Sequence, residues 1–176
     1  MVELIVEDGT IVPDANSYVS VDDIIKYAEA RGVVLIPGSP IDPVKVAIMA
    51  INAMDYIEMF KYRWKGKRVN PSLQRLSWPR EGVVIDGERW PSDKIPDELI
   101  AAQCQLCIQI SRGVNLLPTV SADEAFITKE KVGPIETEYS EAVRLAASNL
   151  PVMPAVDALL AVLLDGALGR LRTVRI

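Results

Sequence analysis

The sequence predicts a mainly α-helical single domain, a small bundle of about four to five helices, with long ordered loops and short β segments at the N- and C-termini. Two observations support this fold class. Apolar residues recur at helical spacing in several segments that begin and end with capping residues. Between these segments, Pro and Gly interrupt regular structure. The chain has 176 residues, of which 49% are hydrophobic and only 6% aromatic. A core of ordinary size can therefore form, and it must be largely aliphatic.

The first part of the chain is expected to be extended and the second to be a helix. Residues 1–19 form a predicted N-terminal extended segment, because a short β-prone stretch is followed by turn residues. The first helix should begin at Ser20, which can cap it. Asp23, three residues later, completes an acidic variant of the capping box. Gly32 is a suitable residue to end this helix.

Two longer helices are predicted next. One begins after Asp42 as the N-cap, with Pro43 at the first helical position, and runs to about Phe60. It is apolar nearly all round, so we expect it to be central to the core or shared with a neighbouring subunit. The other begins near Pro96 and ends at Gly113. Its polar positions are Gln103, Gln105 and Gln109.

The last third of the chain is less regular. Residues 114–139 form a predicted extended segment in which Phe126–Thr128 and Lys131–Val132 alternate enough for short strands. Ser140–Asn149 is compatible with a short helix, and Ala155–Leu164 reads as a helix. Residues 166–176 form a predicted C-terminal strand or tail. Such a strand needs a pairing partner within the chain or in a neighbour.

Residues 61–95, called the basic loop below, stand out from the rest of the chain. The net charge of the whole chain is −5, yet residues 61–80 contain seven Lys or Arg residues and no acid. All three tryptophans, Trp64, Trp78 and Trp90, also lie here. A loop of this length in a compact domain is usually functional or disordered, and the aromatic residues favour order.

Three interpretations of the basic loop remain open from the sequence. It can be a solvated surface loop whose cations cover the aromatic rings. It can be a DNA-facing surface that contacts backbone phosphates, or it can be a contact between subunits. The candidate DNA-facing residues are Lys61, Lys65, Lys67 and Arg68. The candidate interface residues are Trp64, Arg75, Trp78, Arg80 and Trp90, with Glu136, Glu138 and Tyr139 of a later acidic segment as the complement.

The composition argues against an enzyme. The chain has no histidine, which removes the commonest general base and metal ligand. Cys104 and Cys107 fit a CxxC spacing, but they lie inside an apolar helix, where two buried hydrophobic residues are the simpler interpretation. No Gly-rich phosphate loop occurs. We therefore expect no catalytic residue, no cofactor and no metal. We also expect a soluble intracellular protein without a signal peptide or a membrane partner.

Several sequence blocks resemble a known family. In order, they are VEDGT, ANSYVSV, WKGKRVNP, LSWPREGV, IPDELIAAQCQLCI and KVGPIETEY, and they extend from about Val6 to Tyr139. Together they resemble the tailed-phage and prophage proteins labelled DnaT-like single-stranded-DNA-binding, whose members look like phage head–tail connector (adaptor) proteins.

This resemblance implies a function. A connector would be a structural virion protein of the phage neck, made in the host cytoplasm. It would form a homo-oligomeric ring, typically a dodecamer, and contact the portal protein and downstream neck or tail proteins. Double-stranded DNA would pass through its channel without sequence specificity. The second hypothesis is a DnaT-like single-stranded-DNA-binding replication or primosome protein, and a third is a small assembly chaperone.

Overall fold

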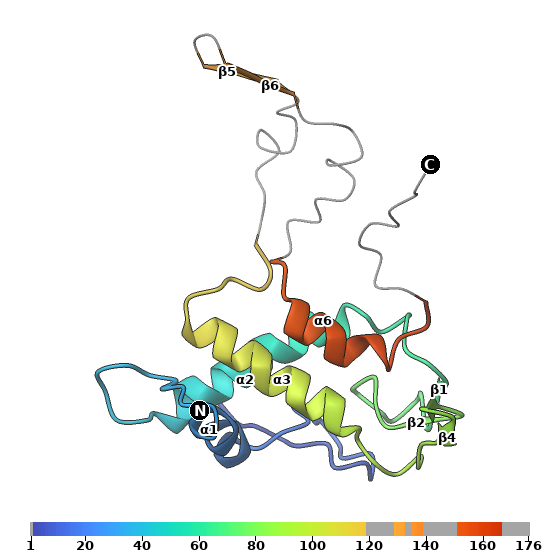
Figure 1. The fold of residues 1–176 in the computed structure, drawn as a ribbon. Helices are drawn as coiled ribbons and strands as arrows, with labels where there is room; N and C mark the ends of the chain where they lie inside the picture. Colours follow the sequence, from blue (N-terminus) through green and yellow to red (C-terminus); the bar gives the residue numbers. More distant parts are fainter. Residues whose placement is uncertain (1, 119–128, 133–134, 139–150, 167–176) are drawn as a thin grey trace.

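The computed structural model describes residues 2–118, 129–132, 135–138 and 151–166. Within these ranges the chain forms four helices and three two-stranded antiparallel sheets (Figure 1). The helices are α1 (Val21–Glu29), α2 (Pro43–Glu58), α3 (Asp97–Ser111) and α6 (Pro154–Ala161). The paired strands are β1 (Lys67–Arg68) with β2 (Arg80–Glu81), β3 (Val84–Ile85) with β4 (Glu88–Arg89), and β5 (Lys129–Val132) with β6 (Ile135–Glu138). The fold is mixed α/β, and the prediction of a mainly α bundle is wrong.

Two of the three sheets lie inside the basic loop, where the sequence predicted no strands. Their strands are only two residues long, which is too short to show the alternation of apolar and polar residues that marks a strand. The turn between β3 and β4 consists of Asp86 and Gly87, whose φ angles are 51° and 85°. Positive φ at both central residues is the requirement of a type I′ hairpin turn, which Asp-Gly satisfies well.

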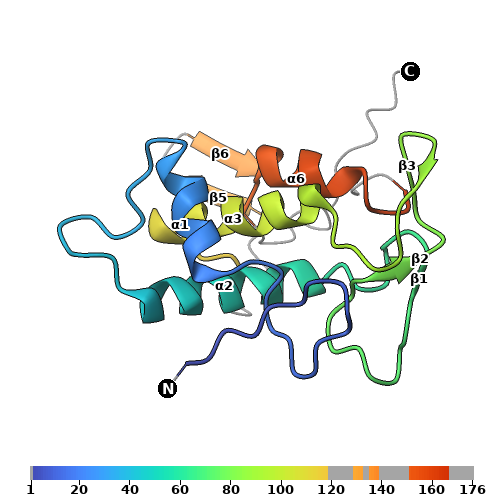
Figure 2. The ribbon, with the colours of Figure 1, turned by 90° about the horizontal axis from the view of Figure 1, so that it is seen from below.

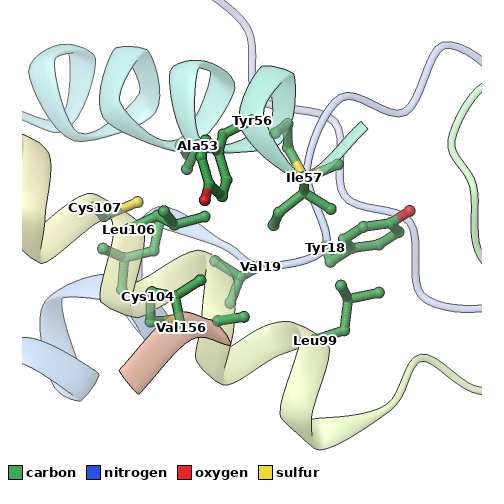
Figure 3. Packing of buried hydrophobic residues seen from close by; sticks show 14 of the residues in the cluster. Tyr18, Val19, Ala53, Tyr56, Ile57, Leu99, Cys104, Leu106, Cys107 and Val156 are labelled. Carbon is green, nitrogen blue, oxygen red and sulfur yellow. The ribbon is translucent and has the colours of Figure 1, made fainter. Parts of the chain in front are cut away.

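Helix α3 is the centre of the helical layer, because it packs against α1, α2 and α6 (Figure 2). Leu106 and Cys104 of α3 belong to the same buried cluster as Tyr56 of α2 and Val156 of α6 (Figure 3). The helix after Asp42 was predicted to be central to the core or shared with a neighbouring subunit. Helix α2 does bury one side against α3, and it leaves Val44 and Ile48 exposed on the other.

The predicted helix starts are confirmed at two positions. The Ser20 side chain accepts a hydrogen bond from the Asp23 backbone N–H at 3.2 Å and so caps α1. The Asp42 carboxylate accepts one from the Val44 backbone N–H at 2.9 Å, with Pro43 at the first position of α2. Both groups satisfy donors that a helix start leaves unpaired.

Buried polar groups hold the N-terminal segment against the helices. Gln103 of α3, predicted as one of the polar positions, is fully buried. Its amide oxygen accepts a hydrogen bond from the Tyr18 backbone N–H at 2.9 Å, and its amide nitrogen donates to Ser17 Oγ and to the Ala50 carbonyl. One side chain therefore links three parts of the chain: the N-terminal segment, α2 and α3.

Several predictions for the last third of the chain lie wholly or partly outside the described residues. They are the strand at 126–128, the helix at 140–149 and the C-terminal strand, of which only Gly166 is described. The helix predicted at Ala155–Leu164 is found as α6, slightly earlier in the chain. The β5–β6 hairpin stands apart from the helices (Figure 1).

Replacing Gln103 should destabilise the protein more than replacing a neighbouring glutamine. Gln103→Leu leaves the buried Tyr18 N–H without an acceptor, so we expect the free energy of unfolding to fall by about 1–3 kcal/mol. Gln105→Leu, on the same helix at a partly exposed position, is the matched control and should change it by about 0.5 kcal/mol or less. Urea denaturation followed by circular dichroism measures both. Equal losses would contradict the role given to the Gln103 amide.

Candidate functional site

The basic loop is anchored by aromatic rings that continue from the end of α2. Tyr56, Phe60, Trp64 and Trp78 make successive edge-to-face contacts, with ring centroids 5.6, 6.4 and 6.2 Å apart. Trp64 is 3% exposed and Trp78 is fully buried. Large buried rings in this arrangement contribute strongly to packing. These two tryptophans are therefore the core of the loop, not part of its surface.

The Arg80 side chain organises the loop backbone. Its guanidinium donates to the carbonyls of Lys65 (2.7 Å), Ser77 (3.1 Å), Gly66 (2.7 Å) and Trp64 (3.4 Å). Only 7% of the residue is exposed. Burial, and secondarily the nearby Arg68 guanidinium, lowers the pKa of Arg80. A planar group with five N–H donors is suited to hold several carbonyls at once.

A second polar group fixes the middle of the loop to α2. The Glu58 carboxylate accepts from the Ser77 backbone N–H at 2.9 Å and from the Ser77 hydroxyl at 2.7 Å. The Tyr18 hydroxyl donates to the same carboxylate at 3.4 Å and accepts from the Trp78 backbone N–H at 3.1 Å. Burial and the Glu58 charge raise the pKa of Tyr18 well above its ordinary value.

The start of the loop is also paired with the chain that follows α6. The Lys65 N–H donates to the Leu163 carbonyl at 3.0 Å, and the Asp165 N–H donates to the Arg63 carbonyl at 2.7 Å. Lys65 Nζ donates to the Val162 carbonyl at 2.7 Å. The Lys65 side chain, predicted to face DNA, is thus engaged in holding the fold together.

The outer face of the loop carries cations that the fold does not use. Lys67 and Arg89 are exposed and Arg68 is half-buried, and none of the three side chains forms an ion pair or hydrogen bond with another described residue. Lys61 is also exposed, with its Nζ 4.9 Å from the ring centroid of Tyr62. Tyr62 itself is 88% exposed. Exposed basic groups and an accessible aromatic ring therefore occur within one ordered loop.

A groove lies between the β1–β2 and β3–β4 pairs. It has a volume of about 560 Å³. Lys67, Arg89, Trp90 and Glu81 supply its charged and aromatic lining. Gly66 brings the two strands of the first pair close together, since a Cβ there would lie 2.3 Å from the Glu81 carbonyl oxygen.

Two other hollows lack this combination of free cations and an accessible ring. One, at the end of α3, is lined by Asp55 and by Asn, Ile, Val and Leu residues. The other lies beside the N-terminal segment and includes Glu7 and Asp8 together with Lys94 and the buried Tyr18. The groove between the two strand pairs is therefore the candidate site.

The structure separates the residues that were predicted as a subunit interface. Trp64, Trp78 and Arg80 lie inside the subunit. Arg75 is exposed and lies 3.9 Å from the Asp14 carboxylate. Trp90 is partly exposed at the groove. Glu136 and Glu138 belong to β6, in the hairpin that stands apart from the helices, and Tyr139 lies outside the described residues.

Sequence reasoning missed Arg89 and Glu81 as site residues. Arg89 follows the Asp86-Gly87 turn and pairs with Val84 in the second hairpin. An Asp-Gly pair between β-prone residues is a strong local hairpin signal, and it would have placed Arg89 beside the strand before the turn. The partnership of Glu81 with Lys67 across β1 and β2 has no comparable local signal.

The cysteines and the acidic residues of the described chain are further candidates for nucleophiles and for metal ligands. Burial raises the pKa of Cys104 to about 12 and raises that of Cys107 further, so both thiols are poor nucleophiles. No metal-binding group of three or more His, Cys, Asp or Glu residues occurs in the part of the chain that the structure describes. Across the same residues, no helix combines the length and apolar character that a membrane crossing needs.

The sequence matches the family model described as "Putative DnaT-like ssDNA binding protein" over residues 2–176. No curated protein and no solved structure matches the chain. Because the family model covers nearly the whole sequence, the chain belongs to this family.

The family match corrects the leading functional prediction. The resemblance implies a phage head–tail connector that forms a ring below the portal. Nothing in the match links the family to connector proteins, and its description favours the second hypothesis, single-stranded DNA binding. The prediction of a neck or adaptor protein, with its ring and portal contacts, is therefore wrong on this finding.

Shortening the Arg80 guanidinium to an ammonium should destabilise the protein. Arg80→Lys cannot reach four carbonyls in one plane, so we expect the free energy of unfolding to fall by about 3 kcal/mol. Arg75→Lys, at an exposed position in the same loop, should change it by about 0.5 kcal/mol or less. Guanidinium denaturation followed by tryptophan fluorescence reports on both variants. A small loss at Arg80 would argue against its role in the loop.

Proposed function

We propose that this member of the DnaT-like ssDNA-binding family binds single-stranded DNA through the outer face of the basic loop, without sequence preference. We further propose that it acts as an accessory factor in replication or primosome assembly, as a binding protein without catalysis. The family assignment suggests DNA binding in general. The loop geometry supports the specific surface.

The proposal rests on one observation. Lys67, Arg68 and Arg89 lie on an ordered loop, and their charged groups are not engaged with other described residues. Cations held in this way can neutralise backbone phosphates and release counterions, which is the main source of sequence-independent affinity. The buried Arg80, in contrast, already uses its donors on backbone carbonyls.

The remainder of the chain restricts binding to this face. The net charge is −5 although the loop is rich in Lys and Arg, so the other surfaces carry an excess of acid. Acidic surfaces repel phosphates, and binding should therefore be local and sensitive to salt. A binder of this kind covers a short length of strand.

Reversing two loop charges should weaken binding to single strands. We expect Lys67→Glu/Arg89→Glu to lower the affinity for an oligothymidylate about tenfold at low salt, since two phosphate contacts are replaced by repulsion. The slope of log K against log salt concentration should become shallower by about 1.4, at about 0.7 per phosphate contact. Fluorescence anisotropy across a salt series measures both quantities.

The matched control reverses two exposed lysines elsewhere. Lys26→Glu/Lys45→Glu changes the net charge by the same amount on α1 and α2. It should leave the slope unchanged. An equal loss in both double variants would show that net charge alone matters, and a wild-type protein that binds no single strand at low salt would refute the proposed function.

A further inference from the structure

We propose that the groove beside Trp90 holds one unpaired base, stacked on the indole ring, with the adjoining phosphates on Lys67 and Arg89. This inference rests on the proposed function and adds a reason for preferring single strands to duplex. It assigns a ligand class, a nucleobase with its Watson–Crick edge free, to a defined hollow of the structure.

Trp90 differs from the other two tryptophans in its surroundings. Trp64 and Trp78 are buried in the aromatic packing of the loop, whereas Trp90 is partly exposed and lines the groove. Its indole N–H donates to the Lys94 carbonyl at 3.1 Å, and its backbone N–H donates to the Val83 carbonyl at 2.9 Å. A ring already held in place loses little freedom when a base stacks on it.

The size of the groove suits one base and its sugar. At about 560 Å³ it lies within the range of small-ligand sites. Stacking of a base on an aromatic side chain is tolerant of sequence, because every base presents a π face. The groove therefore fits the non-specific binding proposed above.

The charges of the groove also favour a base over a phosphate alone. Glu81 lies opposite Lys67 in the β1–β2 pair and lines the same groove. A carboxylate repels a phosphate, but it can accept a hydrogen bond from an N–H group of a base. In duplex DNA the Watson–Crick donors are already paired and both faces of the base are stacked. An unpaired base offers both interactions at once.

Two ligands of equal length test this inference: an oligothymidylate and an abasic oligomer. The abasic strand keeps the phosphates and sugars but has no base to stack. We expect the wild-type protein to bind it about tenfold more weakly than oligothymidylate. Tryptophan fluorescence should be quenched by oligothymidylate and not by the abasic strand, because Trp90 is the accessible indole.

Two substitutions of Trp90 test whether its indole ring causes the difference in affinity between the two strands. Trp90→Leu keeps apolar bulk without a flat ring, and it should bind oligothymidylate and the abasic strand with equal affinity. Trp90→Phe restores a ring and should recover part of the difference. Tyr62→Leu, which removes the exposed ring elsewhere in the loop, is the control and should keep the full difference. Circular dichroism and thermal melting confirm that each variant is folded.

The possible outcomes separate the two proposals. If wild-type protein binds oligothymidylate and the abasic strand equally, the base site is refuted while phosphate binding stands. If it binds neither, the proposed function fails and the base site fails with it. If Trp90→Leu is unfolded, the wild-type comparison of the two strands, together with the Trp90→Phe variant, still decides the question. A tenfold difference that Tyr62→Leu abolishes and Trp90→Leu retains would also refute the site at Trp90.

Discussion

The basic loop depends on how one buried cation is compensated. The Arg80 guanidinium has no carboxylate within ion-pair distance among the described residues, and its donors go to backbone carbonyls instead. Leaving such a group unsatisfied in the interior would cost several kcal/mol, so the loop must keep those carbonyls converged. Because the carbonyls come from the start of the loop and from Ser77 in its middle, this single requirement specifies much of the path of the loop between them.

This arrangement divides the loop into an inner and an outer side with different physical roles. The inner side holds Trp64, Trp78 and Arg80, which are buried against other parts of the loop. The outer side holds Lys67 and Arg89, whose charges have no partner among the described residues. Substitutions on the inner side should therefore act on stability, and those on the outer side on binding. Tryptophan and basic residues occur on both sides of the loop. Whether such a residue stabilises the fold or is available for binding depends on how it is packed.

The sequence correctly predicted features that depend on local interactions, such as the helix caps. It did not predict features that depend on contacts between segments distant in the sequence. Ser20 and Asp42 cap their helices through bonds that span two or three residues, so their pattern is visible in the sequence. Gln103 was predicted as a polar position of its helix. It is buried instead, because Ser17 and Ala50, which are distant in the sequence, accept hydrogen bonds from its amide. The distinction between Arg80 and Lys67 has the same origin. Either residue is simply basic until the carbonyls around it are placed.

A hydrogen-bonded loop on an acidic protein is a suitable site for the weak, local recognition of single strands proposed above. The backbone that carries Lys67 and Arg89 is already paired in strands, so binding has to order only their side chains. Trp90 is likewise held by its hydrogen bond to the Lys94 carbonyl before any ligand arrives. Preorganisation of the backbone and of the Trp90 ring reduces the conformational entropy lost on binding, so a few contacts can give measurable affinity.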